Sequence, residues 1–261
     1  MDEIKRIPTI EFNEVQIRTN FNRIKLTKDY FITLLLYLIK GVDGIYFKGG
    51  TAINKIFLNH ARLSEDIDFA LTKNVAKVKK EIQEIIEKSG LFKRITEGKN
   101  VEGFLRMVVW YKGFEDEEDY IFIDLNQREK IILPTEFSKI KHFYSQFIPE
   151  FSIKTINKEE IIADKVAATI GRNKPRDHLD IYNIIRAKIP INMKLAKKKC
   201  EGAGDEFSLI KMFNKAKTLK NRWDKDMASL ITEPIKFKKV IQYLAKYFNL
   251  KEEKVRLVKK I

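Results

Sequence analysis

The sequence has very few of the residues that form disulfides and zinc sites. It contains one cysteine, Cys200, in 261 residues, so no intramolecular disulfide can form. Only three histidines accompany it, namely His60, His142 and His178, which disfavours a Cys/His zinc site. The sequence therefore excludes an intramolecular disulfide and disfavours a zinc site of Cys and His ligands.

A long hydrophobic run is also missing. The first twelve residues, MDEIKRIPTIEF, contain no apolar core of the kind found in signal peptides. The most apolar stretch, Tyr30 to Val42, is too short to span a bilayer and includes Lys40. We therefore expect a cytoplasmic protein without a membrane partner.

Acidic residues are also fewer than basic ones. The 36 acidic residues face 51 Lys and Arg, which gives a formal net charge of +15. Such an excess favours a polyanionic partner such as nucleic acid, although charge spread evenly over the surface would only keep the protein soluble. Hydrophobic residues make up 44% of the chain, which is enough for a sizeable core.

Hydrophobic spacing predicts both helices and strands in the first part of the chain. Thr27 can cap a helix whose apolar residues keep helical spacing, so we expect a core-packed helix over Thr27 to Lys40. The short apolar run that ends at Gly49-Gly50 indicates a strand that enters a tight turn. We further expect a helix from Thr51, a strand over Ile67 to Leu71 and a helix over Asn74 to Ser89.

Two longer β-type segments follow, and then the pattern changes. Phe104 to Tyr111 and Tyr120 to Asn126 flank the acidic turn Glu115 to Asp119, which predicts a hairpin. From about Asn157 onward, one helical pattern follows another. We therefore expect an α+β protein with a mixed α/β domain over residues 1–150 and a helical domain over residues 151–261.

One ordered set of residues fits the chemistry of phosphoryl or nucleotidyl transfer. Such chemistry needs backbone N–H groups directed at phosphate oxygens and carboxylates that hold divalent metal ions. Gly49-Gly50-Thr51 supplies a glycine turn at the start of a helix, and Asp66 and Asp68 would project from one face of a strand. Each motif is weak alone, but their order on these elements predicts a metal-dependent transferase.

Asp124 is the natural third carboxylate. It lies in the apolar strand segment Ile121 to Leu125, where an Asp is costly to bury unless it is paired or binds a metal. Strand alternation places it on the same face as Phe122. An Asp on a solvated strand face is the alternative interpretation.

The chain resembles the AbiEii/AbiGii nucleotidyltransferase toxin family, which includes MenT-like toxins. Four blocks match in order: Phe47-Lys-Gly-Gly-Thr-Ala-Ile; Arg62-Leu-Ser-Glu-Asp-Ile-Asp-Phe69; Glu160-Ile-Ile-Ala-Asp-Lys-Val-Ala-Ala; and Arg176-Asp-His-Leu-Asp-Ile-Tyr182. The departures, Leu63 and Ile53, remove no chemical group. The resemblance implies a polymerase-β-like core with a mixed, mostly antiparallel sheet, followed by a helical bundle that closes the active-site cleft.

The resemblance also implies roles for particular residues. Asp66 and Asp68, with Asp124 as a third ligand, would hold two Mg²⁺ ions, which Mn²⁺ could replace. The expected nucleotide contacts are Lys48, Gly49, Gly50, Thr51, Lys165, Arg176 and Asp177. Lys165 and Asp180 are expected in the catalytic set, although Asp177 remains the alternative acid because its place in the first turn of a helix already explains it. Arg172 is a further candidate for a phosphate or RNA contact.

The implied reaction transfers a nucleoside monophosphate from an NTP to RNA and releases pyrophosphate. The resemblance points to tRNA 3′ ends as the acceptor and to the toxin of a toxin–antitoxin or abortive-infection system, with an antitoxin protein as its partner. Two alternatives remain. The same fold can transfer a phosphoryl or nucleotidyl group to a protein side chain, or it can act as a non-catalytic module that binds RNA or an antitoxin.

Overall fold

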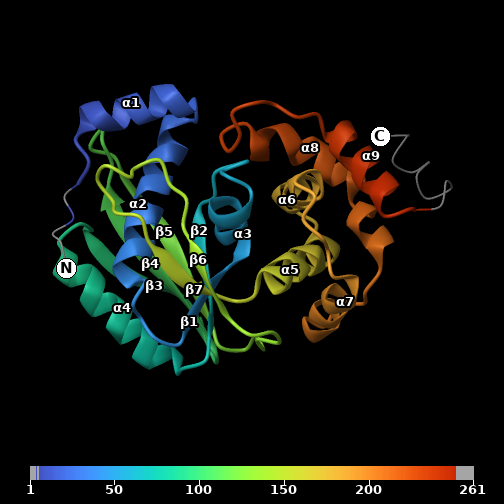
Figure 1. The fold of residues 1–261 in the computed structure, drawn as a ribbon, viewed down its shortest axis with the longest axis horizontal. Coiled ribbons are helices and arrows are strands. Elements are labelled where there is room, and N and C mark those ends of the chain that lie inside the picture. Colours follow the sequence, from blue (N-terminus) through green and yellow to red (C-terminus); the bar gives the residue numbers. More distant parts are fainter. Residues whose placement is uncertain (1–3, 5, 251–261) are drawn as a thin grey trace. The chain divides into compact units, whose positions relative to one another are not determined.

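The computed structural model describes residues 4 and 6–250 (Figure 1), so the end of the expected helical domain, residues 251–261, lies outside it. The chain divides into two compact units, Met1–Asn157 and Lys158–Ile261. The last strand of the first unit, β7 (Ser152–Thr155), still pairs with the sheet, so sheet formation continues beyond residue 150.

The first unit is built on one mixed sheet. Within the described residues it has seven strands in the order β3-β4-β5-β2-β1-β7-β6. The pairs β1–β7 and β2–β5 are parallel, and the other neighbours are antiparallel. The strands are β1 (Ile45–Lys48), β2 (Asp66–Leu71), β3 (Arg94–Val101), β4 (Phe104–Lys112), β5 (Glu118–Asn126), β6 (Glu136–Lys139) and β7. The expected α+β fold with a mostly antiparallel sheet is confirmed.

Patterning found some strands and missed others. The predicted hairpin is present as β4 and β5, with Tyr111 opposite Asp119 beside the turn. Strand β3 was not predicted because its sequence, RITEGKNV, lies almost entirely exposed at the sheet edge and carries no apolar alternation. Strands β6 and β7 are only four residues long, too short for a clear pattern.

Among the described residues, five helical segments accompany the sheet of the first unit (Figure 1). They are α1 (Thr9–Thr19), α2 (Arg23–Ile39), α3 (Gly49–Ala52), the π-helical η1 (Ile53–Phe57) and α4 (Val75–Ser89). Three of them, α2, α3 and α4, contact its strands. The prediction that Thr27 starts α2 was wrong: Asn22 caps the helix by accepting a hydrogen bond from the Lys25 amide, and Thr27 is buried inside it. The start of α4 is confirmed, with Asn74 as its cap.

The second unit is helical, as expected. It contains α5 (Lys158–Gly171), α6 (Pro175–Arg186), α7 (Met193–Gly202), the 3-10 turn η2 (Leu209–Phe213), α8 (Ala216–Met227) and α9 (Phe237–Tyr247). Trp223 anchors α8, since its ring is buried and its indole N–H donates to the Ile235 carbonyl at 2.7 Å. No helix within residues 4 and 6–250 is long and apolar enough to cross a membrane.

A buried ion pair links α2 to η1 in the first unit. The Lys55 ammonium lies 2.7 Å from the Asp29 carboxylate, and both side chains are only 2% exposed. Lys55 also donates to the Thr33 hydroxyl at 2.9 Å, and the Tyr144 hydroxyl donates to Asp29 at 3.2 Å. Because two ions are removed from water here, the pair stabilises the fold only while both partners remain.

We predict that Lys55→Ala lowers the free energy of unfolding by about 3–5 kcal/mol, because it leaves the Asp29 charge buried without its cation. The double variant Asp29→Leu/Lys55→Met should recover most of this loss, since the Tyr144 hydroxyl keeps the Leu26 carbonyl as an acceptor. Urea unfolding measures both. Equal losses in the single and double variants would contradict the explanation.

Candidate active site

Four charged residues form a row across the sheet. Lys48 on β1 is the register partner of Asp68 on β2, Asp68 is the partner of Asp124 on β5, and Asp124 is the partner of Arg106 on β4. Register partners on adjacent strands project from the same face, about 5 Å apart at Cβ. The two predicted carboxylates, Asp68 and Asp124, are therefore neighbours with a cationic residue on each outer side.

Asp66 lies on the same face, two residues before Asp68 on β2. Its register partner is Phe122, which lies two residues before Asp124 on β5. The side chains on this face are half-buried, namely Asp66, Asp68, Phe122 and Asp124. The alternate residues Ile67 and Ile123 are fully buried on the opposite face. The structure therefore brings Asp66, Asp68 and Asp124 to one face of two adjacent strands.

Arg106 is the residue beside the acids that sequence reasoning missed. Its guanidinium donates from Nε to Asp124 Oδ1 and from Nη2 to Oδ2, both at 2.7 Å. The side chain is held over the Phe122 ring, 4.4 Å from its centroid. Asp124 therefore has a bidentate cationic partner. The hydrogen bond to Asp124 raises the pKa of Arg106, and the negative charges of Asp66 and Asp68 raise it further.

Hairpin register was the signal that could have identified Arg106. Lys112 and Glu118 pair beside the turn, and counting outward along both strands brings Arg106 opposite Asp124. A cation and a carboxylate at matching positions of a predicted hairpin indicate a cross-strand pair. Our prediction considered Asp124 alone.

The three carboxylates fit a hard divalent ion in kind, because Mg²⁺ takes oxygen ligands. Among residues 4 and 6–250, however, no group of three His, Cys, Asp or Glu residues lies in an arrangement that could hold a metal ion. Both Asp124 oxygens accept hydrogen bonds from Arg106, so a metal ion at this carboxylate would compete with the guanidinium. The metal-ligand set stays a prediction.

The glycine turn lies directly against Asp68. Gly49 has a φ of +80°, and a Cβ at this position would overlap the Asp68 carboxylate. Glycine is therefore needed both for the backbone conformation and for the approach of the turn to the acid. The helical segment begins at Gly49, two residues before the expected start at Thr51.

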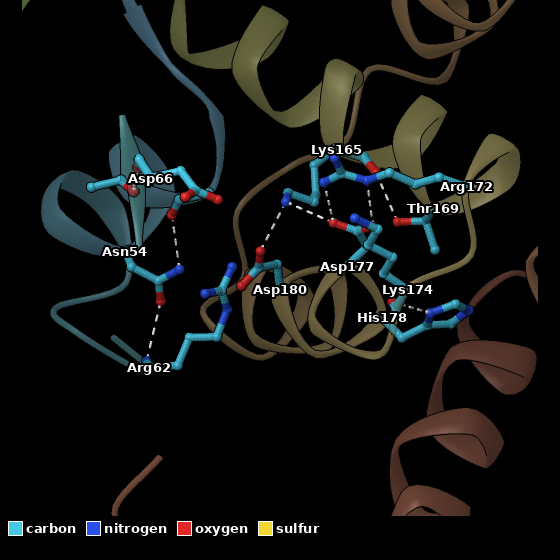
Figure 2. Close-up of polar contacts among 12 residues, drawn as sticks. Asn54, Arg62, Asp66, Lys165, Thr169, Arg172, Lys174, Asp177, His178 and Asp180 are labelled. Atoms are coloured by element: carbon cyan, nitrogen blue, oxygen red, sulfur yellow. Dashed lines mark hydrogen bonds and ion pairs between the residues drawn. The ribbon is translucent and has the colours of Figure 1, made fainter. Parts of the chain in front are cut away.

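Side chains around this turn fix its position. The Thr51 hydroxyl donates to the Asp66 carbonyl and is buried, and Lys48 forms an ion pair with Glu129. Figure 2 shows Asn54 beneath the turn: its amide donates to the Gly50 carbonyl at 3.0 Å, and its oxygen accepts from the Arg62 amide at 3.2 Å. The nucleotide contacts expected of Lys48, Gly49, Gly50 and Thr51 remain predictions.

In the second unit, Lys165 is held between two carboxylates (Figure 2). Its ammonium lies 3.0 Å from Asp177 Oδ1 and 2.9 Å from Asp180 Oδ2, and all three side chains are almost completely buried. Asp177 also accepts two hydrogen bonds of 2.8 Å from Arg172. Burial raises the pKa of Asp177, but Lys165 and Arg172 outweigh this effect and lower it below the usual range.

The remaining predicted residues of the second unit differ in exposure. Arg176 is half-buried on α6, next to Asp177, while the Arg172 side chain is 48% exposed. His178 is buried, with its ring nitrogens 3.0 Å from the Lys174 carbonyl and 2.7 Å from the Met212 carbonyl. This histidine therefore fixes η2 against α6. The catalytic roles of Lys165, Asp177 and Asp180 are not tested by these contacts.

The sequence profile of the nucleotidyl transferase AbiEii toxin family, from type IV toxin–antitoxin systems, matches residues 38–245. The chain belongs to the AbiEii nucleotidyltransferase toxin family. This match includes both units and every predicted site residue, and it confirms the resemblance seen in the sequence.

Solved structures show the same fold as this nucleotidyltransferase. MenT4, a nucleotidyltransferase toxin from Mycobacterium tuberculosis, is 17% identical, with a TM-score of 0.65, over 97% of this chain and 94% of its own. JHP933 from Helicobacter pylori is 16% identical, with a TM-score of 0.62, over 92% of this chain and 94% of its own. Comparison with curated protein sequences found no significant match.

We predict that Gly49→Ala destabilises the nucleotidyltransferase by about 1–3 kcal/mol more than Gly90→Ala. Both glycines have positive φ, so both variants carry the strain of a left-handed alanine, about 1–2 kcal/mol. Only Gly49 faces Asp68, because a Cβ at Gly90 meets nothing within 4 Å. Urea unfolding compares the two variants, and equal losses would show that the turn does not depend on its approach to Asp68.

Proposed function

We propose that this nucleotidyltransferase transfers a nucleoside monophosphate from an NTP to an RNA 3′ hydroxyl, with the tRNA 3′ end as the acceptor. The observation that carries the proposal is the position of Asp66, Asp68 and Asp124 on one sheet face beside the Gly49 turn. In this reaction the acceptor oxygen bonds to the α-phosphorus, the bond to pyrophosphate breaks and the hydroxyl proton is lost.

Asp66 and Asp68 would hold Mg²⁺ or Mn²⁺, and Asp124 would join them after releasing Arg106. A pair of such ions supplies charge neutralisation at the phosphates and activation of the acceptor hydroxyl. The released Arg106 guanidinium remains beside the site, where it can contact a phosphate oxygen.

The turn and Lys48 would contact the triphosphate. The Gly49 and Gly50 amides begin a helical segment, where N–H groups favour phosphate. Thr51 contributes through its backbone, since its hydroxyl already binds the Asp66 carbonyl. Asn54 keeps the turn rigid through the Gly50 carbonyl.

The second unit would supply further phosphate contacts through Lys165 and Arg176. Lys165 is already oriented by Asp177 and Asp180, so a nucleotide would bind a lysine of fixed position. Arg172 also holds Asp177, which supports a structural role for that acid and leaves Asp180 as the proposed catalytic one.

A toxin of this family has a cognate antitoxin and a nucleotide substrate. Its formal net charge of +15 supports RNA as the acceptor, because phosphate backbones attract basic proteins. Blocking tRNA 3′ ends would stop translation, which places the proposed activity in the cytoplasm.

The first test incubates the protein with α-labelled NTPs, Mg²⁺ and total RNA. We predict labelled RNA with the wild type and about 1,000-fold slower labelling with Asp66→Asn, because losing a metal-binding carboxylate removes several kcal/mol of transition-state stabilisation. Circular dichroism should show that the variant is folded.

The other outcomes would overturn the assignment. Transfer of γ-label, or of α-label to protein, would indicate a kinase-like or AMPylating enzyme. Label on RNA that persists unchanged in Asp66→Asn would remove the proposed site, and RNA binding without any transfer would indicate a non-catalytic module.

A second prediction concerns Arg106. If Asp124 is a metal ligand, Arg106→Gln should tighten Mn²⁺ binding severalfold, because the metal no longer competes with the guanidinium for both carboxylate oxygens. Electron paramagnetic resonance titration of Mn²⁺ measures this directly. Arg94→Gln is the matched control, since Arg94 is also paired with a carboxylate and lies over an aromatic ring. Unchanged affinity in Arg106→Gln would exclude Asp124 from the ligand set.

A further inference from the structure

Three aromatic rings continue the acidic face of the sheet. Phe122 is the register partner of Asp66, and Tyr120 lies two residues before Phe122 on β5, on the same face. Trp110 on β4 is the register partner of Tyr120. We call Trp110, Tyr120 and Phe122 the aromatic platform; it begins where the acidic residues end.

The rings are neighbours, and the Tyr120 ring is tilted by 46° to Phe122 and by 58° to Trp110. The Tyr120 ring centroid lies 4.9 Å from that of Phe122 and 5.1 Å from that of Trp110. The indole N–H of Trp110 donates to the Thr96 hydroxyl on β3 at 3.0 Å, which fixes the position of this ring. Such an arrangement is held in place before any ligand binds.

Two guanidinium groups lie on the platform. Arg94 lies 4.2 Å from the Trp110 centroid, and Arg106 lies 4.4 Å from the Phe122 centroid. Each arginine also pairs with a carboxylate, Glu118 at 2.6 Å and Asp124 at 2.7 Å respectively. While these pairs are formed, the arginine charges are largely compensated, and the guanidinium planes add to the surface available for stacking.

The three rings are more exposed than the residues that alternate with them on β4 and β5. Tyr120 is 36% exposed, and Trp110 and Phe122 are half-buried, whereas the alternate residues Val109 and Ile121 are completely buried. The hydrophobic core is thus built from the other face of β4 and β5. Aromatic side chains on the polar face contribute less to that core and remain able to contact a ligand.

The distance from the platform to the acids suits a short single strand. Tyr120 and Asp124 are four residues apart on β5, which spans about 13 Å at ~3.3 Å per residue. This is close to the length of four stacked nucleotides at about 3.4 Å each. A strand whose bases lie on the platform can therefore extend its end to Asp66, Asp68 and Asp124.

We propose that the aromatic platform binds the last nucleotides of a single-stranded RNA acceptor by base stacking and directs its 3′ end toward the acids. The direction of the strand rests on the proposed function, but the stacking does not. Proteins bind unpaired bases on exposed aromatic rings and arginine planes, and stacking tolerates any base because every base has a π face. The net charge of +15 supplies attraction for the phosphates.

Fluorescence anisotropy of a labelled eight-nucleotide single-stranded RNA, without NTP or metal, tests the proposal. Trp110→Ala and Tyr120→Ala should each weaken binding about 5- to 150-fold, as expected for the loss of one base stack. Trp110→Phe should retain most of the affinity. The slope of affinity against salt concentration should stay unchanged, because stacking neutralises no phosphate.

Phe137→Ala is the matched control. Phe137 is 72% exposed on β6, at the opposite edge of the same sheet, so its loss should not change RNA binding. Urea unfolding of every variant separates a lost ring from a lost fold. Unchanged binding in both Trp110→Ala and Tyr120→Ala, or equal binding of a blunt RNA duplex, would overturn the proposal.

One further variant separates this proposal from the proposed function. Asp66→Asn should lose nucleotidyl transfer and keep wild-type affinity for the oligonucleotide. If the wild type transfers nothing but the platform variants still lose binding, the platform stands and the proposed function falls. If Trp110→Ala transfers nucleotide to RNA with an unchanged KM for RNA, the proposed function stands and the platform falls.

Discussion

Repulsion between adjacent carboxylates is the constraint on which this active site depends. Asp68 and Asp124 are register partners on neighbouring strands, and Asp66 lies two residues away on the same face. At about 5 Å and an effective dielectric constant of about 20, two such charges repel by about 3 kcal/mol. Cations close by relieve this repulsion while both acids stay ionised, and the protein can provide such cations itself or bind them.

The chain provides a cation of its own on each side of the pair Asp68 and Asp124. Arg106 satisfies both oxygens of Asp124, and Lys48 occupies the outer position beside Asp68, where it also pairs with Glu129. Lys165 is different, because there a single ammonium is held by Asp177 and Asp180, with Arg172 as the second cation. The buried pair of Asp29 and Lys55 is different again, since it is complete in itself and joins two helical elements. Of these three clusters, the row on the sheet is the one that combines half-exposed acids with a glycine turn at contact distance.

Sequence patterns predicted the parts of this arrangement that depend on local spacing. The positions of Asp66 and Asp68 on one strand, the hairpin and the side of β5 that carries Asp124 follow from the two-residue period of a strand. Pairings between distant segments do not follow in this way. The parallel alignment of β2 with β5 decides that Asp68 lies beside Asp124, and it results from tertiary packing rather than from either strand alone. The prediction that the helix starts at Thr27 was wrong for a related reason. Asn22 caps the helix, and Thr27 is a residue of its interior that is buried in the core.

The same two-residue period explains why chemistry and the proposed acceptor surface share a face. Helices α2 and α4 cover the face formed by Ile121, Ile123 and their neighbours, so polar and aromatic residues of β2, β4 and β5 can be placed only on the other one. The register of the β4–β5 hairpin then sets two contacts, Arg106 with Asp124 and Trp110 opposite Tyr120. The parallel register of β2 with β5 adds the third, Phe122 beside Asp66. A shift of β5 by one residue relative to its neighbours would turn Asp124, Tyr120 and Phe122 into the core. Because that shift would also expose three buried apolar side chains, the stability of the core itself holds the acids and the rings in their common register.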